Sequence, residues 1–92
     1  MVRVVVLYDE EPDAERYERH AELCRAVTGV TFRHGKVFGA PFGDPAFVYY
    51  AEMEFANMDA FRAATKTPEF AATGTDSKEM GYRSTVQFVE LA

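Results

Sequence analysis

Four segments of the chain have patterns of hydrophobic and polar residues that are typical of β-strands. These segments cover residues 1–8, 30–38, 46–55 and 83–91. The first is a run of β-branched residues, which predicts a strand buried on both faces. The third is the most regular, because apolar residues recur there at every second position. Its other face is mixed and must meet water, a partner's sheet or a polar cavity.

Residues 12–27 have the periodicity of an amphipathic helix. Tyr17 and Cys24 fall on its apolar face at about 100° per residue, and His20 lies within the same stripe. Gly29 is a suitable residue for the helix end. An imidazole that points towards a core, between a phenol and a thiol, is either a hydrogen-bonded structural group or the floor of a pocket.

The second helical region is predicted to be interrupted. Asn57 is a suitable N-cap for a helix over residues 58–65. Pro68 then begins a second helical piece, over residues 69–72. Residues 73–81 are polar and contain two glycines, which predicts a loop or a flap over a site.

The order of these elements, βαββαβ, predicts an α+β fold. Two such split units form the ferredoxin-like sandwich, a four-stranded antiparallel sheet that carries both helices on one face. At 92 residues the chain is expected to be a single domain, 1–92. The other sheet face would remain uncovered. Because residues such as Val48 and Tyr50 lie on it, we expect a homodimer that forms sheet to sheet.

Composition narrows the classes of partner. The net charge is −5 and the basic residues are scattered, so no nucleic-acid partner is expected. The longest apolar run, residues 4–8, is too short to cross a bilayer, so no membrane partner is expected. Cys24 is the single cysteine and the N-terminus has no signal-peptide pattern, which makes the cytoplasm the expected location.

Several motifs, in their order and spacing, resemble those of the EthD-domain family, within the group of dimeric α/β-barrel proteins. Residues 46–55 are similar to the family's third strand, whose core reads A-E-x-x-F. Residues 57–61 resemble the acidic and hydrophobic start of its next helix. Residues 68–70, together with the later Asp76, match an S-P-E … D stretch.

The resemblance implies a small, cofactor-free homodimer that pairs as a dimeric α/β barrel. Some members resemble enzymes that act on polyketide-like or lactone substrates, whereas many have no established activity. The helix over residues 12–27 fits the family in two registers. In the ungapped one His20 takes the place of the family's histidine; in the other Arg25 occupies that place and the histidine is missing.

His20 is the candidate catalytic residue. As a general acid or base it needs a pocket, a pKa near neutrality and an orienting partner. Cys24, one turn further on, is either a nucleophile paired with His20 or, as is commoner, a packing residue. By the resemblance Asp76 takes the family's acidic position, where it either orients a histidine or caps a helix.

Strand residues extend the candidate site. Tyr49 and Tyr50 point to opposite faces, so one of them can supply a hydroxyl to a ligand carbonyl, packing being the alternative. Arg33 and His34 alternate in the same way, and Arg33 either holds a ligand oxygen or forms an ion pair. The predicted ligand-binding set is Tyr17, Cys24, Arg33, Tyr49 and Asp76.

No metal ligand is assigned, because His34, Glu52 and Glu54 lack an H-x-H or H-E-x-x-H spacing.

Our leading hypothesis is a protein that binds an apolar, oxygenated small molecule between helices and sheet. If it is an enzyme, we expect cofactor-independent proton transfer at a carbonyl (isomerisation, cyclisation or dehydration) with His20 as acid or base. The alternative is a non-catalytic dimeric accessory or ligand-binding protein with a structural His20. Haem or oxygen chemistry has less support, since tryptophan is absent and no histidine is placed as an axial ligand.

Overall fold

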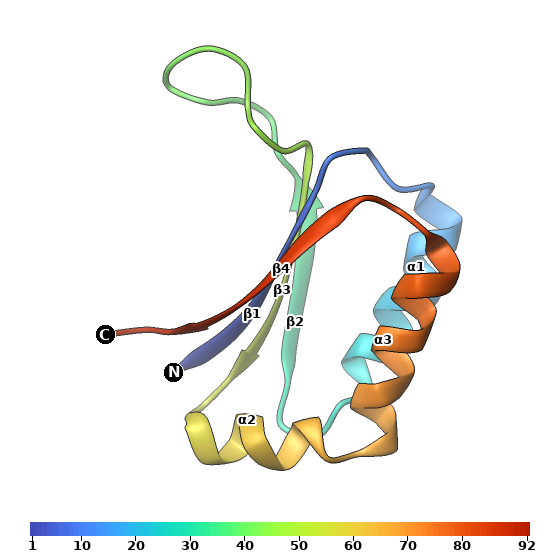
Figure 1. The fold of residues 1–92 in the computed structure, drawn as a ribbon, viewed down its shortest axis with the longest axis vertical. Coiled ribbons are helices and arrows are strands. Elements are labelled where there is room, and N and C mark those ends of the chain that lie inside the picture. The colour runs from blue at the N-terminus through green and yellow to red at the C-terminus, as the bar shows by residue number, and fades with distance from the viewer.

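The computed structural model describes all residues, 1–92, as one sheet with three helices on one side of it (Figure 1). The predicted order βαββαβ is confirmed, with the second helical region divided in two. The elements are β1 (Val2–Tyr8), α1 (Ala14–Arg25), β2 (Thr31–Lys36), β3 (Tyr49–Phe55), α2 (Met58–Thr65), α3 (Pro68–Met80) and β4 (Ser84–Glu90).

The four strands form a single sheet in the order β2-β3-β1-β4, and every neighbouring pair is antiparallel. This is the ferredoxin-like arrangement that the sequence predicts. Val4 on the central strand β1 lies opposite Met53 on one side and Phe88 on the other. Residues in register share a face, so these three side chains face the helices.

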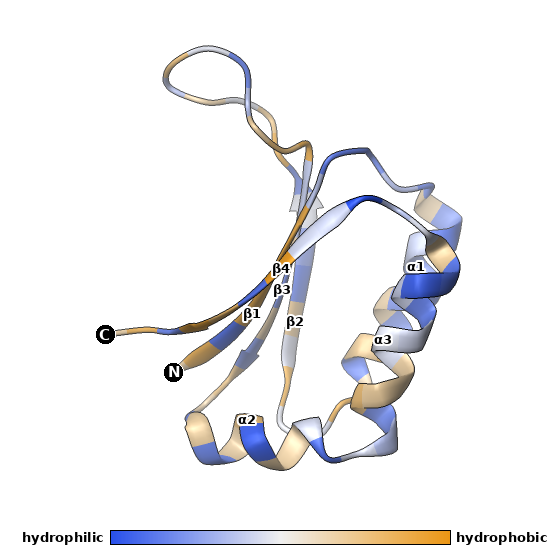
Figure 2. Ribbon diagram, viewed as in Figure 1, coloured by the Kyte–Doolittle hydropathy of each residue, from blue (hydrophilic) through white to orange (hydrophobic).

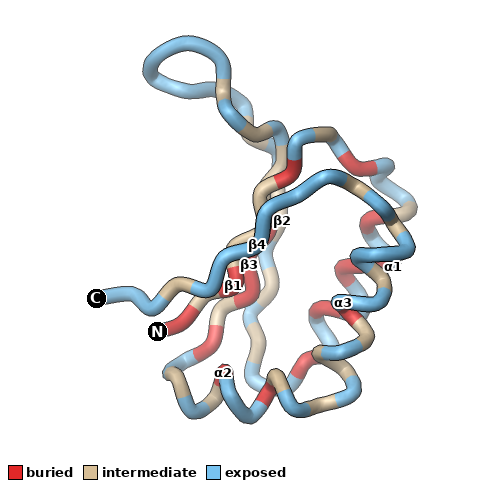
Figure 3. Tube along the Cα trace, in the orientation of Figure 1, coloured by how far each residue is buried: buried red, intermediate tan, exposed pale blue.

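The core lies between this inner sheet face and the helices. Phe55 and Val2 are fully buried there, and Cys24 contributes from α1 and Phe61 from α2. Figure 3 shows the buried residues on β1, β3, α1 and α2, whereas β4 is exposed along nearly its whole length. The core is therefore confined to the middle of the sheet and leaves the β4 edge open.

The central strand β1 is apolar apart from Arg3 and Tyr8 (Figure 2). Its prediction as a strand buried on both faces is wrong within a single chain. Val5 and Leu7 point away from the helices and are only half-buried, because no element of this chain covers that face. A β-branched run alone does not tell whether the second layer comes from the same chain.

Helix α1 is shorter than the predicted range of residues 12–27. The Asp13 carboxylate accepts a hydrogen bond from the backbone N–H of Arg16, which fixes the helix start at Ala14. The apolar stripe is confirmed, since the buried residues of α1 include Tyr17, His20 and Cys24.

The prediction of a loop over residues 73–81 is wrong. Thr67 caps α3, Pro68 occupies its first turn, and the helix continues to Met80, where Gly81 ends it with φ of 70°. Helix α3 packs mainly on α1, and only Thr73 of its residues is fully buried. A helix with so little buried apolar surface has no hydrophobic stripe by which the sequence could reveal it.

The opposite, open face of the sheet carries a cluster of charges, which we call the outer cluster: Arg3, Arg33, Glu52 and Glu54. Cross-strand register brings them together, because Arg33 lies opposite Glu52 and Arg3 opposite Glu54. Glu52 is only 8% exposed. The predicted mixed face of β3 is therefore an ion-pair network on the uncovered side of the sheet.

The loop over residues 37–48 extends beyond the sheet and leans away from the helices (Figure 1). It carries Phe38 and Phe42, whose exposed fractions are 100% and 91%. Strands β2 and β3 are consequently shorter than predicted. None of the helices has the length and hydropathy that a membrane crossing requires.

Candidate functional site

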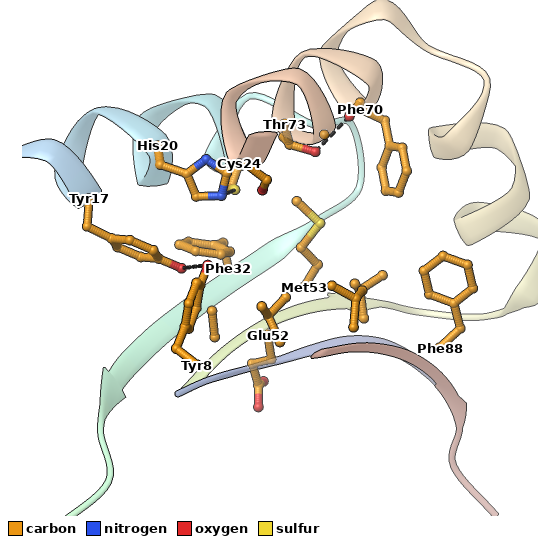
Figure 4. Close-up of a pocket in the computed structure, with 16 residues that line it drawn as sticks. Tyr8, Tyr17, His20, Cys24, Phe32, Glu52, Met53, Phe70, Thr73 and Phe88 are labelled. Atoms are coloured by element: carbon orange, nitrogen blue, oxygen red, sulfur yellow. Dashed lines mark hydrogen bonds between the residues drawn. The ribbon is translucent and has the colours of Figure 1, made fainter. Parts of the chain in front are cut away.

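A cavity of about 220 Å³ lies between the inner face of the sheet and helices α1 and α3 (Figure 4). Val86 and Phe88 of β4 line it and are 56% and 64% exposed, so the cavity opens at that edge of the sheet. Most of the lining is apolar, which suits a largely hydrocarbon ligand. The main apolar lining residues are Val4, Val6, Phe32, Met53, Phe70 and Phe88.

His20 reaches this cavity from α1. It lies one turn after Tyr17 and one turn before Cys24, and all three side chains line the cavity. In Figure 4 the imidazole points from the helix towards the space above the sheet. The spacing that the sequence reveals thus places His20 at a void, which satisfies the first requirement for an acid–base role.

Asp76 on α3 holds the His20 ring in place. The Nδ1 atom of His20 lies 2.9 Å from Oδ2 of Asp76. Arg16 donates two hydrogen bonds to the same carboxylate, from Nη1 to Oδ2 (3.1 Å) and from Nη2 to Oδ1 (2.6 Å). We call Arg16, His20 and Asp76 the inner cluster. Asp76 lies in the interior of α3, so its predicted capping role is wrong and the orienting alternative fits.

The inner cluster determines which ring nitrogen of His20 carries the proton. Hydrogen bonds from Arg16 hold the pKa of Asp76 below its ordinary value despite its burial, so it is an ionised acceptor. Nδ1 of His20 must therefore carry the proton. Burial lowers the pKa of His20 below 6.5 and the charge of Arg16 acts in the same direction, although Asp76 opposes both. At neutral pH His20 is a neutral imidazole with its lone pair on Nε2.

Cys24 is the one protein group near that lone pair, with its Sγ 3.5 Å from Nε2. Burial raises the pKa of the thiol to about 12, so it is protonated at neutral pH. A protonated thiol is a weak donor and a poor nucleophile. The arrangement therefore suits Cys24 as a lining residue and leaves the basic nitrogen of His20 within reach of a ligand.

Tyr17 and Tyr8 make a second polar contact next to His20 in the cavity. Their hydroxyl oxygens lie 2.9 Å apart, and both residues are almost completely buried. The rings of Tyr17 and His20 have centroids 5.4 Å apart, so the hydroxyl pair and the imidazole share one end of the cavity. Tyr8 is a cavity residue that was not predicted from the sequence. The available signal was its place on the same face of β1 as Val2 and Val4, with a hydroxyl at the strand end.

Tyr49 and Arg33 do not join this group. The Tyr49 hydroxyl lies 2.6 Å from Nδ1 of His34, and its ring packs behind Tyr17 without lining the cavity. Arg33 lies on the open face, where its Nε donates to Glu52 over 2.9 Å. Of the predicted set, the structure brings Tyr17, Cys24 and Asp76 together with His20.

The possible metal ligands of the sequence do not converge. His34 faces the helices and is opposite Ala51, whereas Glu52 is opposite Arg33 and points to the other side of the sheet. Figure 4 likewise shows the Glu52 side chain directed away from the cavity. Although Glu52 lies along the cavity, its carboxylate is directed to the open side of the sheet.

The whole chain resembles solved structures of ferredoxin-like proteins. An ethyl tert-butyl ether d (EthD) family protein from Bacillus halodurans c-125 is 25% identical, with a TM-score of 0.81 over 100% of this chain and 99% of that one. A dimeric ferredoxin-like protein of unknown function from Jannaschia sp. CCS1 is 18% identical, with a TM-score of 0.71 over 98% of both chains. SnoaB, a cofactor-independent oxygenase from Streptomyces nogalater, is 19% identical, with a TM-score of 0.62 over 99% of this chain and 92% of that one.

A family model provides the assignment. The model described as "EthD domain" matches residues 8–80, a span that includes α1, the third strand and Asp76. A search among curated proteins gave no match. The matched span covers most of the 92 residues and agrees with the motifs that suggested this resemblance. The chain belongs to the EthD-domain family.

Proposed function

We propose that this protein binds a small, apolar, oxygenated molecule in the cavity and transfers a proton at a carbon next to its carbonyl group. The observation that carries the proposal is the placement of His20, which is oriented by Asp76 and faces a cavity with a largely apolar lining. Burial lowers the pKa of His20, which favours its neutral form. A general base with a pKa at or somewhat below neutrality is present in its basic form when it meets the substrate.

The proposed chemistry is a carbon-to-carbon proton shift or the related elimination. Nε2 of His20 accepts the proton, and the C–H electron pair forms the double bond of an enolate while the carbonyl oxygen takes the negative charge. Asp76 stabilises the imidazolium that results, as its hydrogen bond to Nδ1 strengthens. Return of the proton to another carbon completes an isomerisation, and departure of a leaving group completes a dehydration.

These residues need no bound cofactor for that reaction, because the proton acceptor and its orienting carboxylate both come from the chain. A fold neighbour, SnoaB, is described as a cofactor-independent oxygenase. Catalysis without a cofactor therefore has a precedent on this fold. The oxygenase activity itself is a property of SnoaB and is not proposed for this chain.

Deuterium exchange tests the proposal without knowledge of the natural substrate. β-Tetralone, a small cyclic ketone, is incubated with the protein in D₂O, and loss of its α-proton signals is followed by ¹H NMR. We expect exchange faster than in buffer, and a loss of roughly 10²–10⁴-fold of the protein-dependent rate in His20→Gln.

His34→Gln is the matched control, because His34 is the other histidine and does not line the cavity. It should exchange β-tetralone at close to the wild-type rate. Equal rates for wild type, His20→Gln and buffer would contradict proton transfer.

The second candidate is a non-catalytic ligand-binding protein. It is favoured by one observation, the contact of Cys24 with Nε2, which gives both ring nitrogens of His20 a protein partner. On this alternative β-tetralone binds but does not exchange, and Cys24→Ala does not change that result. Exchange that depends on His20 rules it out.

We further propose a homodimer formed through the open sheet face. Val5 and Leu7 are half-buried on that face, the outer cluster is already neutralised within it, and two neighbours of this fold are described as dimeric. Light scattering at micromolar concentration should give twice the chain mass. Leu7→Glu places a like charge on both copies and should give a monomer, whereas Arg19→Glu, on the exposed side of α1, should not. A wild-type monomer would contradict the proposal.

We also propose a cytoplasmic location. Cys24 is a buried free thiol beside the site, and a reducing compartment keeps thiols in that state. Cell fractionation tests this assignment, and recovery from a secreted or membrane fraction would contradict it.

A further inference from the structure

The hydroxyl pair of Tyr8 and Tyr17 has a hydrogen-bonding capacity that the protein does not use. The two oxygens lie 2.9 Å apart at the cavity, and neither has another hydrogen-bond partner in the chain. Each hydroxyl carries one proton and can accept as well as donate. When one donates to the other, the proton of the acceptor is left without a protein acceptor, whichever way the pair is arranged.

This unused donor persists across the physiological pH range. Burial raises the pKa of both Tyr8 and Tyr17 above the ordinary value of 10.0. Both side chains therefore remain phenols and neither becomes a phenolate. A buried donor without an acceptor costs free energy, which a ligand oxygen placed there recovers.

The charges around the cavity select the kind of oxygen. The arginines nearest this end, Arg16 and Arg25, are each paired with a carboxylate, Asp76 and Glu18 respectively. Glu52 and its arginine partners lie on the other face of the sheet. Because His20 is uncharged at neutral pH, no free cation neutralises a carboxylate or phosphate in the cavity, and such an anion would be buried unpaired. The donor suits a neutral carbonyl oxygen.

The shape of the cavity places the rest of the ligand. From the tyrosine pair and His20 at one end, the lining continues to Phe70 and Phe88 at the other (Figure 4). An apolar cavity of about 150 Å³ holds benzene. The 220 Å³ here leaves room for a ring with a substituent or for a small fused pair.

We propose that the Tyr8–Tyr17 hydroxyl pair binds the carbonyl oxygen of a neutral cyclic ketone or enone whose hydrocarbon part lies against Phe70 and Phe88. This inference rests on the proposed function and assigns its substrate class. Tyr8 and Tyr17 hold the oxygen, and the same hydrogen bond strengthens when the oxygen becomes an enolate. His20, next to Tyr17, is on the side from which the α-proton leaves.

Binding of three matched probes tests the inference. β-Tetralone, its hydrocarbon analogue tetralin, and the anion naphthoate are titrated into ¹⁵N-labelled protein and followed by ¹H–¹⁵N NMR. We expect wild type to bind β-tetralone roughly two- to tenfold more tightly than tetralin, as one hydrogen bond allows. Naphthoate should bind most weakly.

The double variant Tyr8→Phe/Tyr17→Phe should abolish the preference for the ketone and leave the affinity for tetralin unchanged. Each single variant still contains one phenol proton without a protein acceptor and should keep part of the preference. The single variants are titrated as well, since the same spectra reveal whether either substitution disturbs the fold. Tyr49→Phe is the control, since Tyr49 binds His34 and lies outside the cavity. It should keep the preference.

The outcomes separate the inference from the proposed function. Equal affinity for ketone and hydrocarbon in wild type, a preference that survives the double tyrosine variant, or tighter binding of naphthoate would each overturn the inference while leaving ligand binding intact. A tyrosine-dependent preference without deuterium exchange would support the inference and contradict proton transfer. Failure of all three probes to bind would overturn both.

Discussion

On each side of the sheet an arginine holds a carboxylate, in the strands on the open side and in helices α1 and α3 on the other, and the two arrangements differ in what completes them. In the outer cluster the carboxylates of Glu52 and Glu54 are bound by Arg3 and Arg33, and the Tyr50 hydroxyl donates to Glu52 over 2.8 Å. Every charge has an opposite charge beside it. In the inner cluster Arg16 is the one arginine that binds Asp76, and Asp76 also accepts a hydrogen bond from the imidazole of His20.

The outer and inner clusters differ in the pH at which their side chains titrate and in whether they border the cavity. Burial opposes ionisation of Glu52, but hydrogen bonds from Arg33 and Tyr50 outweigh it and lower its pKa, so the outer cluster stays charged at neutral pH. The inner cluster contains His20, which titrates nearer neutrality and borders a cavity. The outer cluster is suited to holding strands and a partner together, and the inner one to moving a proton.

The largest expected effect breaks the inner cluster. Asp76→Asn removes the charge that stabilises the imidazolium and replaces one carboxylate oxygen by an amide N–H₂ donor, so the side chain no longer fixes the proton of His20 on Nδ1. We expect the exchange of β-tetralone to fall by roughly a hundredfold or more. The measurement is the initial exchange rate in D₂O. A rate within threefold of wild type would show that Asp76 does not orient His20.

The matching change in the outer cluster should act on stability alone. Glu52→Gln removes a buried charge from Arg33 and weakens the cross-strand contact. Urea unfolding should show a loss of about 1–3 kcal/mol in the free energy of unfolding. The exchange rate of the folded protein should stay within twofold of wild type. A large loss of exchange would mean that the two faces are coupled.

A smaller effect is expected in the pH dependence of stability. Because the pKa of His20 in the folded protein lies below its ordinary 6.5, the unfolded chain takes up the proton first as the pH falls. The free energy of unfolding should therefore decrease from pH 7.5 towards pH 5. His34 acts in the same direction, so His20→Gln should remove part of the slope.

Urea titrations of wild type and His20→Gln at several pH values measure that slope. Glu52→Gln is the comparison variant, because the lowered pKa of Glu52 affects stability only at more acidic pH. Stability that rises as the pH falls from 7.5 to 6 would contradict the assigned direction for His20.

The fold could be predicted from the sequence because its signals are local. Two-residue alternation marks β3, and Asn57 and Pro68 mark the starts of α2 and α3. The full length of α3 could not be predicted, since it meets α1 largely through a polar contact, Arg16 with Asp76, and has almost no buried stripe. A helix that is held by polar contacts lacks the hydrophobic periodicity from which helices are predicted.

The part of the site that lies on helix α1 could be predicted from the sequence. Tyr17, His20 and Cys24 share a face at helical spacing, and the structure places all three at the cavity. The sequence does not show which face of β2 is directed towards the helices. Arg33 was therefore predicted to belong to the site, although it lies on the open face of the sheet. The partnership of His20 with Asp76 joins residues 56 positions apart, which only the tertiary structure can establish.

The most direct test is the ¹⁵N NMR spectrum of the His20 imidazole as a function of pH. We predict that His20 carries its proton on Nδ1, that its pKa lies below 6.5, and that its Nε2 signal changes when β-tetralone is added. In Glu52→Gln the same titration should be unchanged. A proton on Nε2, or a pKa at or above 6.5, would contradict the assignment of the inner cluster as the proton-transfer site.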